Sequence, residues 1–64
     1  MRVNGVEIQL ENTMSLSKFL LEQGYDLKRV AIERNGAIVP KGMISQILLS
    51  PEDTLEVVSF VGGG

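Results

Sequence analysis

Few side chains in this chain of 64 residues could do chemistry. It contains neither Cys nor His, which excludes a thiol nucleophile, a Cys/His zinc site and the usual general base near neutral pH. Acidic residues stand at Glu7 and Glu11 and as a pair at Glu52-Asp53. Paired carboxylates act as acid and base only in a cleft that separates their pKa values, and so small a domain has little room for one. We therefore interpret these acids as solvated surface charge and predict neither an enzyme active site nor a metal site.

The strongest chemical feature is the glycine run at the end of the sequence, Gly62, Gly63 and Gly64. Glycine has no Cβ and adopts a wide range of φ and ψ, so such a tail can thread a narrow channel. Three residues can reach about 10 Å beyond a fold. A terminal carboxylate, with a pKa of about 3.5, is ionised at pH 7 and can attack a phosphorus centre. The chain end could therefore be the reactive group, although such glycines are also typical of disordered ends and cloning remnants.

The segment that would carry this tail is expected to be a strand over residues 55–61. Its period-two pattern places Glu56, Val58 and Phe60 on one face, opposite the face of Leu55 and Val57. The outer face of a one-sided sheet should be polar. Val58 and Phe60 therefore indicate a docking patch, because exposed aromatic residues are enriched at interfaces. Two alternatives are that a loop covers these side chains or that they are isolated exposed residues.

The other elements follow from turn and helix signals. Asn4-Gly5 and Asn35-Gly36 predict two hairpin turns, because both central turn positions need φ > 0. Residues 6–11 alternate as a strand that points Val6, Ile8 and Leu10 inward, and residues 30–34 and 37–39 form the second hairpin. Residues 41–49 fit either a helical turn or a short strand.

A short helix is expected between the hairpins. Ser15 can cap it, Leu16, Phe19, Leu20 and Gln23 share one face, and Gly24 suits the left-handed position that ends a helix. About two turns are stable only when packed on another element. The sequence therefore predicts an α+β fold with one main helix on one face of a mixed sheet of four to five strands, in which the last strand joins the two hairpins.

Composition narrows the class of protein further. A chain of this length holds one core, so we predict a single domain over residues 1–61 and a flexible Gly tail over 62–64. The net charge of −2 argues against nucleic acid. No apolar run reaches the roughly 20 residues of a membrane span and no signal peptide opens the sequence. The expectation is a cytoplasmic monomer without membrane contact.

These features together resemble the ubiquitin-like β-grasp fold, and the whole chain closely resembles the ThiS family of sulfur carrier proteins in thiamine thiazole biosynthesis. The resemblance lies in the Asn4-Gly5 turn, the helix segment 15–21, AIERNGAIVPK over 31–41 and DTLEVVSFVGGG over 53–64. It implies a protein cosubstrate rather than an enzyme. An adenylating enzyme of the ubiquitin-activating type (ThiF-like) would use its own ATP to adenylate the Gly64 carboxylate, so the carrier itself would bind no cofactor.

The resemblance also implies the later steps and the partners. A persulfide donor, charged by a cysteine desulfurase, would displace AMP and leave a thiocarboxylate at Gly64. Thiazole synthase (ThiG-like) would then take the sulfur. Gly62 and Gly63 would form a slender stem, and Val58, Phe60 and Val61 would contact both partners. The alternatives are a carrier for molybdopterin or another cofactor, a ubiquitin-like modifier, and a non-catalytic β-grasp interaction module with an inert tail.

Overall fold

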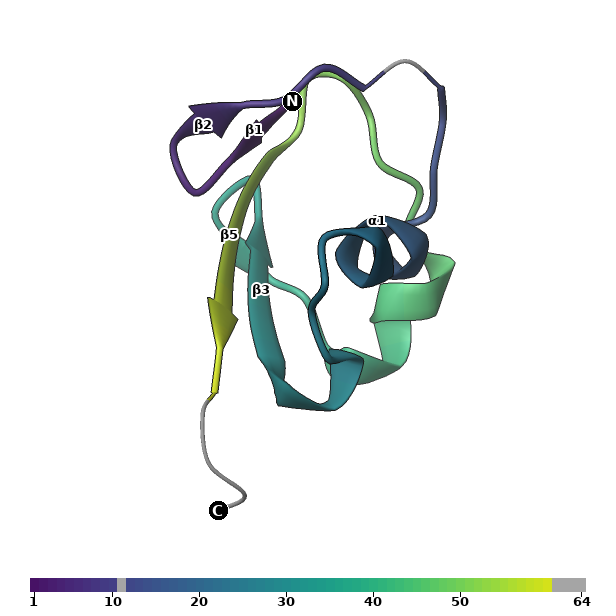
Figure 1. Cartoon of the computed structure of the whole chain (residues 1–64), viewed down its shortest axis with the longest axis vertical. Helices are drawn as coiled ribbons and strands as arrows, with labels where there is room; N and C mark the ends of the chain where they lie inside the picture. Colours follow the sequence, from purple (N-terminus) through teal and green to yellow (C-terminus); the bar gives the residue numbers. More distant parts are fainter. Residues whose placement is uncertain (11, 61–64) are drawn as a thin grey trace.

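The computed structural model describes residues 1–10 and 12–60, and these form an α+β fold with a mixed five-stranded sheet. The sheet order is β2-β1-β5-β3-β4. Figure 1 shows the helices on one side of this sheet, with β5 and β3 side by side. The predicted fold class is confirmed. The elements in chain order are β1 (Arg2–Val3), β2 (Val6–Glu7), α1 (Leu16–Glu22), the 3-10 helix η1 (Leu27–Arg29), β3 (Val30–Arg34), β4 (Ala37–Ile38), the 3-10 helix η2 (Lys41–Gln46) and β5 (Thr54–Ser59).

Both predicted hairpin turns are present with the expected backbone. Asn4 and Gly5 have φ of 50° and 81°, and Asn35 and Gly36 have φ of 53° and 85°. Positive φ at both central positions matches the right-handed twist of the flanking strands. The turns therefore set the register of β1 against β2 and of β3 against β4.

β5 joins the two hairpins, as the sequence predicts. It runs antiparallel to β3, from Arg34 opposite Leu55 to Val30 opposite Ser59. On its other edge it runs parallel to β1, with Val3 opposite Leu55. Its position in the centre of the sheet makes β5 the element on which the fold depends.

The helix α1 begins and ends at the predicted residues. The backbone N–H of Lys18 donates to Ser15 Oγ at 3.1 Å, and Gly24 follows with φ of 89°. Gln23, expected on the buried face, is exposed at the C-terminal cap instead. The other face residues enter the core, whose most deeply buried side chains are Leu16, Leu20, Val30, Leu49 and Leu55.

Two expectations about the N-terminal and central segments need correction or completion. The strand predicted over residues 6–11 is only β2, and Val6 is 62% exposed. The reason is that β2 is the edge strand of the sheet and pairs with only two residues of β1 (Figure 1). Ile8 and Leu10 still pack against the core. In the ambiguous segment 41–49 the helical alternative is present as η2, and in place of a short strand there is one isolated bridge from Leu48 to Ser15.

Candidate functional site

The candidate site lies where β5 ends. Ser59 is the last residue of β5, and the backbone N–H of Phe60 donates to the carbonyl oxygen of Arg29 at 2.7 Å. This bond ties the residue after β5 to the end of η1. The predicted reactive carboxylate of Gly64 lies outside the described residues, as do Val61, Gly62 and Gly63. The described part of the site is therefore the base from which that segment continues.

Val58 and Phe60 are exposed on the outer face of the sheet, 56% and 55% respectively. No loop among residues 1–10 and 12–60 covers them, so that alternative is wrong. Ala31 lies directly across from Val58 on β3, and Ile38 on β4 is 78% exposed. The side chains of Ala31, Ile38 and Val58 line one shallow depression of the outer face together with Glu33 and Glu56. We call Ala31, Ile38, Val58 and Phe60 the apolar patch.

Two members of the apolar patch, Ala31 and Ile38, were not among the residues predicted from the sequence. Ala31 could have been found, because the alternation of Val30–Arg34 turns it outward once Val30 and Ile32 are inside. Ile38 depended on the hairpin register, which places it opposite the exposed Glu33. Toward the other end of β5 the same face becomes acidic, with Glu33 opposite Glu56. The apolar patch therefore borders this acidic pair at Ile38 and extends from there toward the end of β5.

The middle of β5 is held by a side chain that extends the sheet. Where β1 stops, Asn4 Nδ2 donates to the carbonyl oxygen of Val57 at 3.1 Å, and the N–H of Val57 donates to Asn4 Oδ1 at 2.7 Å. Asn4, which lies in the first hairpin turn, therefore also bonds the backbone of β5 with its side chain, as the next residue of β1 would if that strand continued. β5 is bonded along both edges to within two residues of Ser59, which keeps the base of the site in one conformation.

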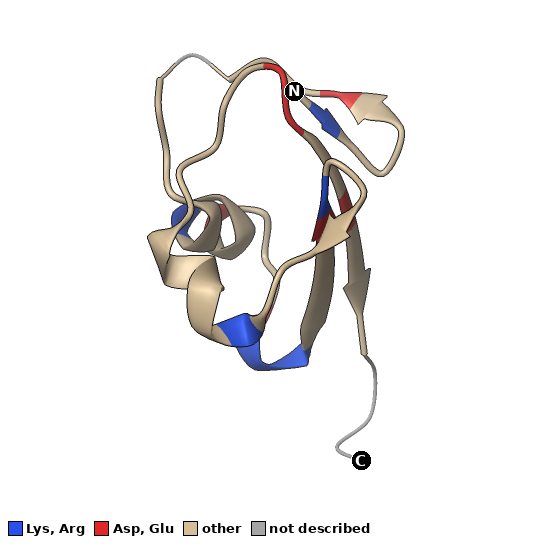
Figure 2. Ribbon diagram, turned by 180° about the vertical axis from the view of Figure 1, so that it is seen from behind, with Lys and Arg blue, Asp and Glu red and all other residues tan. Residues whose placement is uncertain are grey.

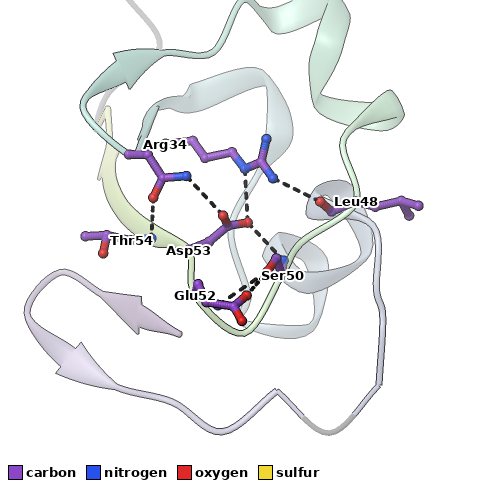
Figure 3. A network of polar contacts seen from close by, with 7 residues as sticks. Arg34, Leu48, Ser50, Glu52, Asp53 and Thr54 are labelled. Carbon is purple, nitrogen blue, oxygen red and sulfur yellow. Dashed lines mark hydrogen bonds and ion pairs between the residues drawn. The ribbon is translucent and has the colours of Figure 1, made fainter.

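Asp53, the residue immediately before β5, forms a polar network (Figure 3). Its carboxylate accepts from Arg34 Nε at 3.0 Å, from Asn35 Nδ2 at 3.0 Å and from the N–H of Ser50 at 2.9 Å. The residue is only 4% exposed. The interpretation of Asp53 as a solvated charge is therefore wrong. The burial of Asp53 could not be predicted from the adjacent residues. The hydrogen-bond donors that allow it come from the second hairpin and from the turn that starts at Ser50.

The same network sets the charge state of Asp53. Burial raises the pKa of the carboxyl, but hydrogen bonds from Asn35, Ser50 and Arg34 and the Arg34 charge together hold that pKa below its usual value. Asp53 is thus an ionised structural group. It lies at the opposite end of β5 from Phe60, and it orders the strand rather than taking part in chemistry at the tail.

Two general features of the described residues bear on the kind of site. No three His, Cys, Asp or Glu side chains within residues 1–10 and 12–60 are grouped so that they could hold a metal ion. In the same residues, no helix has the length and apolar character needed to cross a membrane.

The sheet order, with a parallel central pair and one covering helix, defines a ubiquitin-like β-grasp protein. The chain belongs to the ThiS family, whose model matches residues 1–64. It is 31% identical over 65 residues to the sulfur carrier protein ThiS of Bacillus subtilis strain 168, an alignment that covers 100% of this chain and 98% of that protein.

Two further comparisons concern a longer relative and a solved structure. A thiazole synthase of Paramagnetospirillum magneticum contains a segment 42% identical over 62 residues, which covers 97% of this chain. The chain spans 19% of the length of that relative. The crystal structure of a thiamine biosynthesis protein (ThiS) from Geobacter metallireducens matches with a TM-score of 0.78 and 21% identity, over 98% of this chain and 96% of that one. At this identity the likeness shows a shared fold.

Proposed function

We propose that the protein is a sulfur carrier of thiazole formation in thiamine biosynthesis, and that it serves as a protein cosubstrate rather than as an enzyme. One observation carries the proposal. In a member of the ThiS family, a strand bonded along both edges exposes Val58 and Phe60 beside its end and then continues into Gly62–Gly64. A firmly held base and a side-chain-free extension are what a chain end needs to be presented inside another protein.

The chemistry begins at the Gly64 carboxylate. In the first step one of its oxygens attacks the α-phosphorus of ATP, which is bound by the activating enzyme, and pyrophosphate leaves. In the second step the terminal sulfur of a persulfide attacks the acyl carbon, and AMP leaves with the bridging oxygen. A thiol then cleaves the resulting S–S bond, so the donor becomes a disulfide and a thiocarboxylate remains on Gly64. Every covalent change to the carrier takes place at Gly64, and the role of the described fold is to position the tail.

Each remaining site residue has a positioning role in this proposal. Gly62 and Gly63 form the stem that passes through a channel too narrow for a Cβ. Val58, Phe60 and Val61 contact the surface around the channel entrance, because burying exposed apolar area is the main favourable term in protein association. Thiazole synthase is the proposed recipient of the sulfur. The segments similar to this chain within two thiazole synthases support that choice.

The experiment is an intact mass measurement of the untagged protein. It is incubated with a ThiF-like adenylating enzyme, ATP and a persulfide donor, and fragment masses locate any change. The proposal expects Gly64 to be the last residue and one of its oxygens to be replaced by sulfur. A matched control that lacks Gly63 and Gly64 should keep the fold and remain unchanged in mass.

The outcomes separate the proposal from its alternatives. If the mass of the full chain stays constant while the same enzyme converts a known carrier, the tail is inert and the protein is an interaction module. If thiocarboxylate forms but thiazole synthase cannot consume it, the carrier serves another cofactor. Conjugates of higher mass in a cell extract would instead identify a modifier.

A further inference from the structure

Positive charge gathers at the end of the molecule where β5 ends. Figure 2 shows blue Lys and Arg segments together at that end of the ribbon, while most of the red Asp and Glu segments lie in its middle and at the opposite end. The basic residues at this end are Lys28 and Arg29 of η1 and Lys41, the first residue of η2. They are half of the six Lys and Arg residues of a chain whose net charge is −2. We call Lys28, Arg29 and Lys41 the cationic cluster.

Hydrogen bonds fix the cationic cluster beside the base of the tail. Lys41 Nζ donates to the carbonyl oxygen of Lys28 at 2.6 Å, which joins the two 3-10 helices. The carbonyl oxygen of Arg29 accepts from the N–H of Phe60 at 2.7 Å, which joins η1 to the residue after β5. The adjacent residues 28 and 29 are therefore neighbours of residues 41 and 60, which lie far from them along the chain.

The charges of this cluster are little neutralised. Its one ion pair among the described residues joins Arg29 Nε to Asp26 Oδ2 at 3.7 Å, with both side chains more than half exposed. Such exposed ion pairs contribute little free energy to stability. Lys28 and Lys41 are exposed, and the ammonium of Lys41 has two further protons to donate beyond its bond to Lys28. The three residues of the cluster thus carry an excess of positive charge, of which Asp26 offsets one charge, and this excess can face a partner.

The neighbouring surface indicates a protein as that partner. Phe60 of the apolar patch adjoins the cluster, and the exposed Val58 lies two residues before it. An apolar centre with charges at its rim is typical of protein–protein interfaces. A nucleic acid surface would need a more extensive basic stripe and a basic chain, whereas this chain has a sequence pI of about 4.9.

We propose that Lys28, Arg29 and Lys41 form an electrostatic docking surface for acidic side chains that border the tail-accepting channel of the activating enzyme. The inference rests on the proposed function and adds to it the charge of the partner surface. Complementary charge beside a channel speeds the encounter and selects the orientation in which the tail enters. The acidic opposite end of the carrier would repel the same partner surface and so reinforce that orientation.

The test is ATP–pyrophosphate exchange by the adenylating enzyme with limiting carrier. Lys28→Glu is the main variant, because the Lys28 side chain has no hydrogen bond or ion pair within the described residues. Lys18→Glu on α1 is the matched control, with the same change of charge on an exposed residue away from β5. Ionic strength is raised from about 0.02 M to about 0.5 M, over which the Debye length falls from about 20 Å to about 4 Å.

At low salt we expect Lys28→Glu to lower kcat/KM about tenfold through KM, with kcat unchanged, and to approach wild type at high salt. Lys18→Glu should stay within about twofold of wild type at both salt concentrations. Equal effects of the two variants, or a loss of activity in Lys28→Glu that persists at high salt, would overturn the proposed docking surface. If wild type still supported exchange, the proposed function would not be affected by that result. Absence of exchange with wild type would refute both. Salt-sensitive retention of wild type on duplex DNA, lost in Lys28→Glu, would assign the cluster to a polyanion instead.

Discussion

Replacing Asp53 by Asn tests how β5 is held at its start. The two side chains have nearly the same shape, but the amide has one accepting oxygen where the carboxylate has two. Three donors converge on Asp53, with Arg34 Nε and the Ser50 N–H on Oδ2 and Asn35 Nδ2 on Oδ1. In either orientation of the amide, its NH₂ group must therefore face at least one of these donors.

The magnitude follows from the number and kind of bonds lost. A hydrogen bond to a charged group contributes about 1.5–3 kcal/mol, and removing one partner of a buried ion pair costs about 3–5 kcal/mol. The Arg34 side chain is 32% exposed, so water recovers part of its loss. We expect Asp53→Asn to lower the free energy of unfolding by about 3 kcal/mol. A domain of this length has only about 3–10 kcal/mol in total, so the loss should be plain.

Urea unfolding followed by circular dichroism at pH 7 measures this effect. Glu52→Gln is the control, because it removes the charge of the neighbouring exposed carboxylate but keeps an oxygen that can accept from Ser50 Oγ, so stability should change little. Below its melting temperature, Asp53→Asn should also support pyrophosphate exchange like wild type, because Asp53 and Phe60 lie at opposite ends of β5. A loss of less than about 1 kcal/mol would refute the view that the network holds the start of β5.

Three more outcomes are expected. The pKa of Asp53 is lowered from 3.8. The ionised carboxylate therefore contributes fully to stability above pH 3.8, and this contribution is lost as pH falls through the lowered pKa. Acid unfolding of wild type should show this loss of stability, and acid unfolding of Asp53→Asn should not. Phe60→Ala should raise the KM for the carrier in exchange about tenfold with kcat unchanged, whereas Leu21→Ala, which truncates a side chain 59% exposed on α1, should have no such effect. Asn4→Ala should lower the free energy of unfolding by about 2–3 kcal/mol, because two hydrogen bonds are lost and alanine is strained at the positive φ. Unchanged hydrogen-exchange protection of the Val57 amide would argue against the role of Asn4 in holding β5.

Local signals in the sequence predicted much of the fold. The two Asn-Gly turns, the Ser15 cap and Gly24 depend on backbone preferences of a few adjacent residues, and the structure has each of them where expected. The exposure of Val58 and Phe60 followed from period-two alternation within one strand. The fold class, the joining role of β5 and the described base of the candidate site were therefore accessible without tertiary information.

Only the tertiary structure decided features that need partners distant in sequence. Val6 alternates like a buried residue but is exposed, because β2 lies at the sheet edge. Asp53 is typical of an exposed turn, but the second hairpin supplies the donors that bury it. Lys41 joins Lys28 and Arg29 because η1 and η2 meet at the end of β5. Turn and strand patterns are set by neighbouring residues, whereas burial and charge clustering depend on which elements the sheet and core bring together.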